Sequence, residues 1–180
     1  MPPASDLPTQ SAYAGRWVVM GVSGCGKSTV GAALALHNGV AFIEGDEFHP
    51  DDNVAKMASG VPLDDGDRAG WLQALAGQVG AARAAGTGIV VSCSALKRRY
   101  RDLLRQADPG LRFAHLDGPR ALIEQRMRAR PGHYMPPALL DSQLRDLEAL
   151  QADEAGLTLD ITLPPEELVA RINRNAGRTD

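Results

Sequence analysis

Short apolar runs alternate along the chain with segments in which apolar residues recur at spacings of three and four. The runs predict buried strands at 17–20, 40–43, 89–91, 113–116 and 159–162. The spaced segments predict helices at 27–37, 69–82, 96–107 and 121–130, with a last helix after Pro164 and Pro165. A polar stretch rich in turn residues occupies 44–67. This alternation is typical of an α/β fold with three layers, in which a parallel five-stranded sheet carries helices on both faces.

The length of 180 residues suits one domain, and 44% hydrophobic with 23% charged residues is an ordinary globular composition. We expect a loose leader over 1–15, a single domain over 16–175 and a short tail over 176–180. The formal net charge of −3 gives no basic surface for nucleic acid or a membrane. No apolar run reaches the roughly 18 residues of a membrane span, and the leader does not read as a secretory signal. The two cysteines form no CxxC pair, so a cytoplasmic location is expected.

Residues 21–28 read GVSGCGKS and follow the first predicted strand, where ligands of such sheets bind. They match G-x-x-x-x-G-K-[ST], in which successive backbone N–H groups bind phosphate and the following helix adds its positive dipole end. Lys27 would reach the β- and γ-phosphates of ATP, and the Ser28 hydroxyl would ligate Mg²⁺. A chance match is the alternative, but the flanking strand and helix patterns favour nucleotide binding. The predicted nucleotide-binding residues here are Gly21, Val22, Ser23, Gly24, Cys25, Gly26, Lys27, Ser28 and Thr29.

Asp46 lies just past the second predicted strand, at the same edge of the sheet. In phosphoryl transfer, an acid in this place can accept the proton of the acceptor hydroxyl or hold a water on Mg²⁺. A helix cap or a solvated turn explains its position equally well.

Lys56 and Arg68 are cations within an otherwise acidic stretch, as a carboxylate substrate would require. Opposite unit charges about 4 Å apart attract by roughly 4 kcal/mol at an effective dielectric near 20. Surface ion pairs with Asp64 or Asp67 are the more common alternative.

Three segments resemble the gluconate kinase family: GDEFHPDDNVAKMASGVPLDDGDRAGWL at 45–72, CSALKRRYRD at 93–102 and RMRARPGHY at 126–134. The resemblance extends over about 17–172. It implies ATP-dependent phosphorylation of D-gluconate on its 6-hydroxyl, a step of sugar-acid catabolism that feeds the pentose phosphate pathway. It also implies a P-loop fold like that of nucleoside monophosphate kinases, with a mobile lid at about 130–142, and often a homodimer.

The resemblance also implies roles for individual residues. Asp46 would handle the acceptor hydroxyl, and Lys27 and Arg130 would be catalytic with it. Arg126 and Arg130 lie four apart, on one face of the predicted helix, and would stack on adenine and clamp phosphates. Without the resemblance, both arginines read as surface charge. The implied substrate pocket contains Asp46, His49, Lys56, Arg68, Ser94 and Lys97.

Two other functions remain as alternatives. One is a related kinase of the same fold, acting on shikimate or another aldonic acid, which the 45–72 segment argues against. The other is a nucleotide-binding switch with little turnover. The sequence lacks the N-K-x-D motif of guanine-specific switches, and a gluconate-dependent ADP assay separates the two classes.

Overall fold

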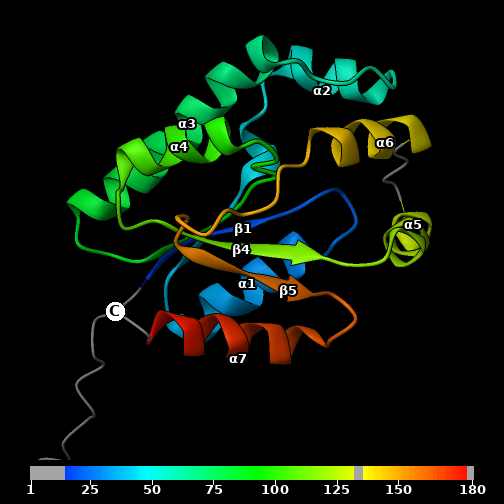
Figure 1. Ribbon diagram of the computed structural model, residues 1–180. Helices are drawn as coiled ribbons and strands as arrows, with labels where there is room; N and C mark the ends of the chain where they lie inside the picture. Colours follow the sequence, from blue (N-terminus) through cyan, green and yellow to red (C-terminus); the bar gives the residue numbers. More distant parts are fainter. Residues whose placement is uncertain (1–14, 132–135, 178–180) are drawn as a thin grey trace, which may run out of the picture.

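The computed structural model describes residues 15–131 and 136–177, which form a three-layer α/β sandwich (Figure 1). Five parallel strands lie in the order β2-β3-β1-β4-β5. The strands are β1 Arg16–Met20, β2 Ala41–Glu44, β3 Ile89–Ser92, β4 Arg112–Asp117 and β5 Gly156–Asp160. Helices α1 (Lys27–Asn38) and α7 (Pro165–Ala176) cover one face, and α3 (Asp65–Ala84) and α4 (Arg98–Ala107) cover the other. The predicted fold class is confirmed.

The central strands are almost continuously apolar because helices cover both of their faces. Val18 in β1 pairs with Val91 in β3 and with Phe113 in β4, and all three side chains are fully buried. Alternate residues of β1 enter opposite cores: Val18 faces α3 and α4, whereas Val19 faces α1 and α7. These cores fix β1 in the middle of the sheet and set the position of the loop that follows it.

Helix α3 begins four residues before the predicted start at 69, because a capping box forms at its first turn. The Asp64 carboxylate accepts a hydrogen bond from the Asp67 backbone N–H (2.8 Å), and the Asp67 carboxylate accepts one from the Asp64 N–H (2.9 Å). The prediction of a turn-rich stretch at 44–67 is therefore wrong in part. This stretch holds a short 3₁₀ helix, η1 (Gly45–Phe48), and α2 (Asp51–Ala58).

In the C-terminal half, strand β5 differs from the prediction at both ends. Strand β5 starts three residues before the predicted 159–162 strand, because its register with β4 already begins at Gly156. It ends at Asp160, whose carboxylate accepts a hydrogen bond from the Thr162 N–H (2.9 Å) and closes a turn. Helices α5 (Arg120–Ala129) and α6 (Pro137–Asp146) lie between β4 and β5 in the chain. The predicted leader lies outside the described residues except for Gly15, as do residues 178–180 of the predicted tail, whereas Ala176 still belongs to α7.

Within 15–131 and 136–177, no helix combines the length and apolar character needed to cross a membrane.

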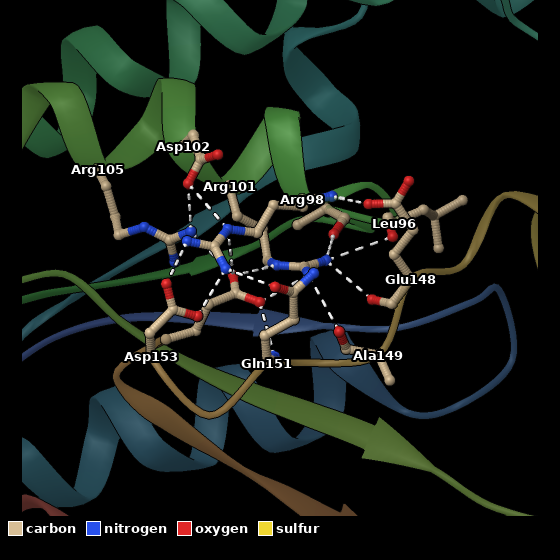
Figure 2. A network of polar contacts seen from close by, with 11 residues as sticks. Leu96, Arg98, Arg101, Asp102, Arg105, Glu148, Ala149, Gln151 and Asp153 are labelled. Carbon is tan, nitrogen blue, oxygen red and sulfur yellow. Dashed lines mark hydrogen bonds and ion pairs between the residues drawn. The ribbon is translucent and has the colours of Figure 1, made fainter.

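Arg101 of α4 is a fully buried cation that holds several backbone segments together. Its guanidinium donates hydrogen bonds to the carbonyls of Ala95, Leu96 and Glu148, at 3.0, 3.3 and 3.1 Å (Figure 2). It also pairs with the buried carboxylate of Glu154 at 2.7 Å. Burial opposes ionisation of Glu154, but hydrogen bonds, chiefly from Arg101, prevail and lower the pKa of this carboxyl to about 2. Arg101 thus anchors both the loop after β3 and the segment after α6.

Replacing Arg101 with methionine should lower the free energy of unfolding by about 3–5 kcal/mol, because Glu154 and the carbonyls lose a buried partner. Urea denaturation measures this loss. Arg171→Met is the matched control, since Arg171 pairs with Glu167 on the surface of α7 and such pairs are worth about 0–1 kcal/mol. Equal midpoints for the two variants would contradict the anchoring role.

Candidate active site

The loop between β1 and α1 forms a cradle of backbone amides at the carboxyl end of the central strand. Gly24 and Gly26 have φ values of 80° and 99°, which glycine adopts without strain. A Cβ atom on Gly24 would lie 2.6 Å from the Met127 side chain, so α5 packs directly on the loop. Lys27 begins α1, and its ammonium folds back to donate a hydrogen bond to the Val22 carbonyl (2.9 Å). Both the helix dipole and the lysine charge therefore act at the cradle.

Glu44 ends β2 beside the cradle and was not among the predicted site residues. The hydroxyls of Ser28 and Ser92 both donate hydrogen bonds to its carboxylate. Hydroxyl and carboxylate oxygens are ligands that Mg²⁺ accepts, and Mg²⁺ needs few from the protein because water and phosphate supply the others. Ser28 and Glu44 therefore fit a magnesium ion. In the sequence, Glu44 is an acid directly after the predicted strand at 40–43 and two residues before Asp46.

Gly45, directly after Glu44, allows the end of β2 to lie close to β3. A Cβ atom at Gly45 would lie only 1.9 Å from the Ser92 carbonyl oxygen, so no larger residue fits. The Gly45 N–H donates to the Ser92 hydroxyl (3.1 Å), and its carbonyl accepts from the Trp71 indole (2.7 Å). These contacts fix the backbone between Glu44 and Asp46.

Asp46 lies in η1, with 76% of its side chain exposed, at the rim of the cradle. The His49 ring is buried against Trp71, with ring centroids 4.1 Å apart, and its Nε2 is 4.0 Å from the Asp46 carboxylate. Burial lowers the pKa of His49; Asp46 opposes this shift and Arg68 adds to it. His49 is therefore neutral at pH 7 and can accept or donate a hydrogen bond beside the Asp46 carboxylate.

Arg68 and Lys97 form a pair of cations over the ring of Tyr100, at 5.4 and 5.8 Å from its centroid. Arg68, buried on α3, donates a hydrogen bond to the Tyr100 hydroxyl (3.0 Å). Asp146 of α6 lies 3.4 Å from Arg68 and 3.8 Å from Lys97, and Asp65 of α3 lies 3.3 Å from Lys97. The two cations therefore already share a carboxylate in the structure.

Lys56 is engaged elsewhere. Its ammonium pairs with Asp67 at 2.6 Å, and this hydrogen bond raises the pKa of Lys56. The pair ties α2 to the capping box of α3, which matches the ion-pair alternative weighed from the sequence.

Cys93, just after β3, lies where the loops that carry the predicted groups meet, since its N–H donates a hydrogen bond to the Val19 carbonyl (3.1 Å). The pKa of this thiol is raised to about 12, chiefly by burial; the Ala95 backbone opposes the shift, the Asp46 charge adds to it, and the Lys27 and Arg68 charges oppose it. All three charges thus act on one buried atom. The next residue, Ser94, is half-buried, and its carbonyl accepts a hydrogen bond from the Gly21 N–H (3.2 Å). The loops after β1, β2 and β3 accordingly form one site.

The two arginines of the predicted adenine clamp differ in placement. Arg126 on α5 lies beside the cradle, since a Cβ atom on Gly26 would be 3.8 Å from its guanidinium. It donates a hydrogen bond to the Ile161 carbonyl (2.8 Å). Arg130 lies after the end of α5 in an extended conformation, because the following Pro131 disfavours helix. The prediction of one shared helix face is therefore wrong. Of the predicted lid at about 130–142, residues 132–135 lie outside the described residues, and 137–142 form the first part of α6.

Comparisons with known proteins agree with the resemblance of the sequence. A family model described as an AAA domain matches residues 17–150. The chain is 45% identical to the thermoresistant gluconokinase of Escherichia coli K12, covering 86% of this chain and 89% of the relative. It is 43% identical to the gluconokinase of Gluconobacter oxydans, covering 91% and 92%. The crystal structure of a gluconokinase from Sinorhizobium meliloti superimposes with a TM-score of 0.84 at 44% identity, covering 92% and 93%. The chain belongs to the gluconokinase family.

Proposed function

We propose that the protein transfers the γ-phosphate of ATP to the 6-hydroxyl of D-gluconate, giving 6-phospho-D-gluconate and ADP. The observation that carries the proposal is the placement of the phosphate cradle beside Asp46 and the Arg68–Lys97 cation pair. A phosphate donor and a small anionic acceptor require these two neighbouring subsites. Relatives at 43–45% identity over most of the chain are named gluconokinases.

The donor half of the site is built mainly from backbone. The amides of residues 21–29 and the Lys27 ammonium bind the phosphates, and Arg126, beside the cradle, stacks on adenine. Ser28 and Glu44 would hold Mg²⁺, which neutralises negative charge on the phosphates when bound. Local fields of this kind explain how a chain with a net charge of −3 binds an anion.

The acceptor half has two cations at one end, for the substrate carboxylate, and a general base at the other. Arg68 and Lys97 bind the carboxylate, while neutral His49 and Ser94 hydrogen-bond to hydroxyls along the sugar chain. Lys56, paired with Asp67, shapes the wall of this pocket. Asp46 receives the 6-hydroxyl at the end nearest the cradle.

Transfer then follows an in-line path. The 6-oxygen attacks the γ-phosphorus, its proton passes to the Asp46 carboxylate, and ADP leaves with the bridging oxygen. Lys27 and Arg130 stabilise the charge that develops on the transferring group. The segment at about 130–142 excludes water, so that ATP is not hydrolysed. The proposal includes a cytoplasmic location, which the two unpaired cysteines led us to expect, and a homodimer, which the resemblance implies.

An acceptor panel tests the proposal, with ADP formation measured by a coupled assay and the product identified by phosphorus NMR. Gluconate should support multiple turnover. Glucose, which lacks the carboxylate, should lose at least about a hundredfold in kcat/KM, because one charge pair is worth roughly 4 kcal/mol. Close aldonic acids and shikimate complete the panel. A preference for shikimate, or equal ATP consumption without any acceptor, would contradict the proposal.

A further inference from the structure

Helix α6 directs two polar side chains, one turn apart, at the two halves of the site. The Gln143 carbonyl oxygen accepts a hydrogen bond from the Ser23 backbone N–H (2.7 Å), and its amide donates to the Ser23 hydroxyl (3.4 Å). Three residues further on, Asp146 pairs with Arg68 and Lys97. One helix thus contacts both the phosphate cradle and the acceptor cations.

These contacts use groups that the proposed substrates would need. The Ser23 amide carries one hydrogen, so it cannot bond strongly to Gln143 and to a phosphate oxygen together. The Asp146 carboxylate has the same chemistry as that of a sugar acid. It pairs with Arg68 at 3.4 Å and lies 3.8 Å from Lys97, whose nearer carboxylate is Asp65 of α3 at 3.3 Å. Each substrate therefore competes with one side chain of α6.

The contacts at the two ends of α6 allow the helix to move as one rigid element when a substrate binds. Directly after the helix, the Glu148 N–H donates to the Leu96 carbonyl (2.7 Å), and Arg101 binds the Glu148 carbonyl. This fixed point lies at the C-terminal end, while the body of α6 lies between α2 and α5 (Figure 1). Gly60 after α2 faces Pro136, and Asp141 of α6 pairs with Arg120 of α5. A turn about the fixed point would withdraw Gln143 and Asp146 together.

We propose that α6 couples the two substrate sites, so that the binding of either substrate strengthens the binding of the other. The first substrate displaces its own competitor and loosens the helix, which lowers the free-energy cost of displacing the second competitor. This inference rests on the proposed function, because it takes the ligand of the cation pair to be the acceptor carboxylate.

Isothermal titration calorimetry tests the coupling with the β,γ-imido analogue of ATP plus Mg²⁺, and with gluconate, each alone and in the presence of the other. In the unmodified protein, each ligand should lower the Kd of the other by the same factor, at least about fivefold. In Asp146→Asn, gluconate alone should bind more tightly and the coupling factor should fall below about twofold. In Gln143→Leu, the nucleotide analogue alone should bind more tightly, with a similar loss of coupling.

Two further variants sharpen the test. Gln143→Glu keeps the hydrogen-bond acceptor and adds a charge, so it should weaken binding of the nucleotide analogue. Arg145→Gln removes an exposed charge from the same helix outside the site and should keep the coupling of the unmodified protein. Urea midpoints establish that each variant is folded.

The outcomes separate this inference from the proposed function. A coupling factor of one in the unmodified protein, unchanged coupling in both variants, or weaker gluconate binding in Asp146→Asn would overturn the role of α6. A protein that neither binds gluconate nor turns it over would overturn the proposed function itself. Gluconate-dependent turnover without coupling would leave the function standing and refute only the inference.

Discussion

Replacing Lys27 with alanine should lower kcat for gluconate-dependent ADP formation by at least about 10²–10³-fold. Lys27 begins α1 and folds over the cradle, 2.9 Å from the Val22 carbonyl, where the β- and γ-phosphates would lie. Loss of one preorganised charge that stabilises a transition state typically costs this much. Among the described residues, the ammonium contacts the Val22 carbonyl and the Cys25 sulfur and no buried acid, so the fold should be unaffected.

Steady-state kinetics at saturating ATP and gluconate measure the loss, and a urea midpoint close to that of the unmodified protein shows that the fold is intact. Lys27→Arg is the matched comparison, because it keeps the charge on a longer, planar group. We expect it to recover only a small part of the rate. A turnover within tenfold of normal for Lys27→Ala would show that the cradle is not the donor site.

Replacing Asp46 with asparagine should lower kcat by about 10²–10⁴-fold and leave the Kd of the nucleotide nearly unchanged. The amide has the same shape as the carboxylate but cannot accept the proton of the acceptor hydroxyl. Because 76% of the Asp46 side chain is exposed, its charge contributes little to folding. Kinetics with gluconate and calorimetry with the ATP analogue separate the two quantities.

The neighbouring Glu47 supplies the control, since it is also exposed in η1, and Glu47→Gln should leave kcat unchanged. An intact rate with weakened nucleotide binding in Asp46→Asn would mean that the proton-accepting role is wrong. A normal rate that is reached only at higher Mg²⁺ would instead favour the alternative in which Asp46 holds a metal-bound water.

The sheet could be predicted from the sequence because its strands carry their own signal. Runs such as Trp17–Met20 are apolar on both faces, and α1 ends at Asn38 with Gly39 as a left-handed cap, one residue after the predicted end at 37. Helix α2 could not be predicted in this way, because its sequence is polar and Asn53 is its only buried residue. The Asn53 side chain donates a hydrogen bond to the Asp67 carbonyl (2.7 Å), a contact that exists only in the folded chain.

The same distinction holds for the site: local sequence patterns indicate some of its residues, and only contacts in the folded chain reveal the others. Lys27, Ser28 and Asp46 follow strands directly, so local pattern and strand order place them together. Gln143 and Glu44 were missed because their partners lie far away in the sequence. Gln143 meets Ser23 across 120 residues, and Ser92 reaches Glu44 across 48. Before folding, Gln143 resembles any polar residue on the surface of a helix.

The buried guanidinium of Arg101 has a consequence for mutational screens. It holds Ala95, which has a φ of 44°, in the loop that leads to Lys97, and it also holds the backbone directly after Asp146. A substitution of Arg101 would therefore displace Lys97 and Asp146 in the acceptor subsite, even in a chain that is still folded. A screen that ranks variants by residual activity alone would misclassify Arg101 as a catalytic residue, although its side chain does not contact the proposed reacting groups.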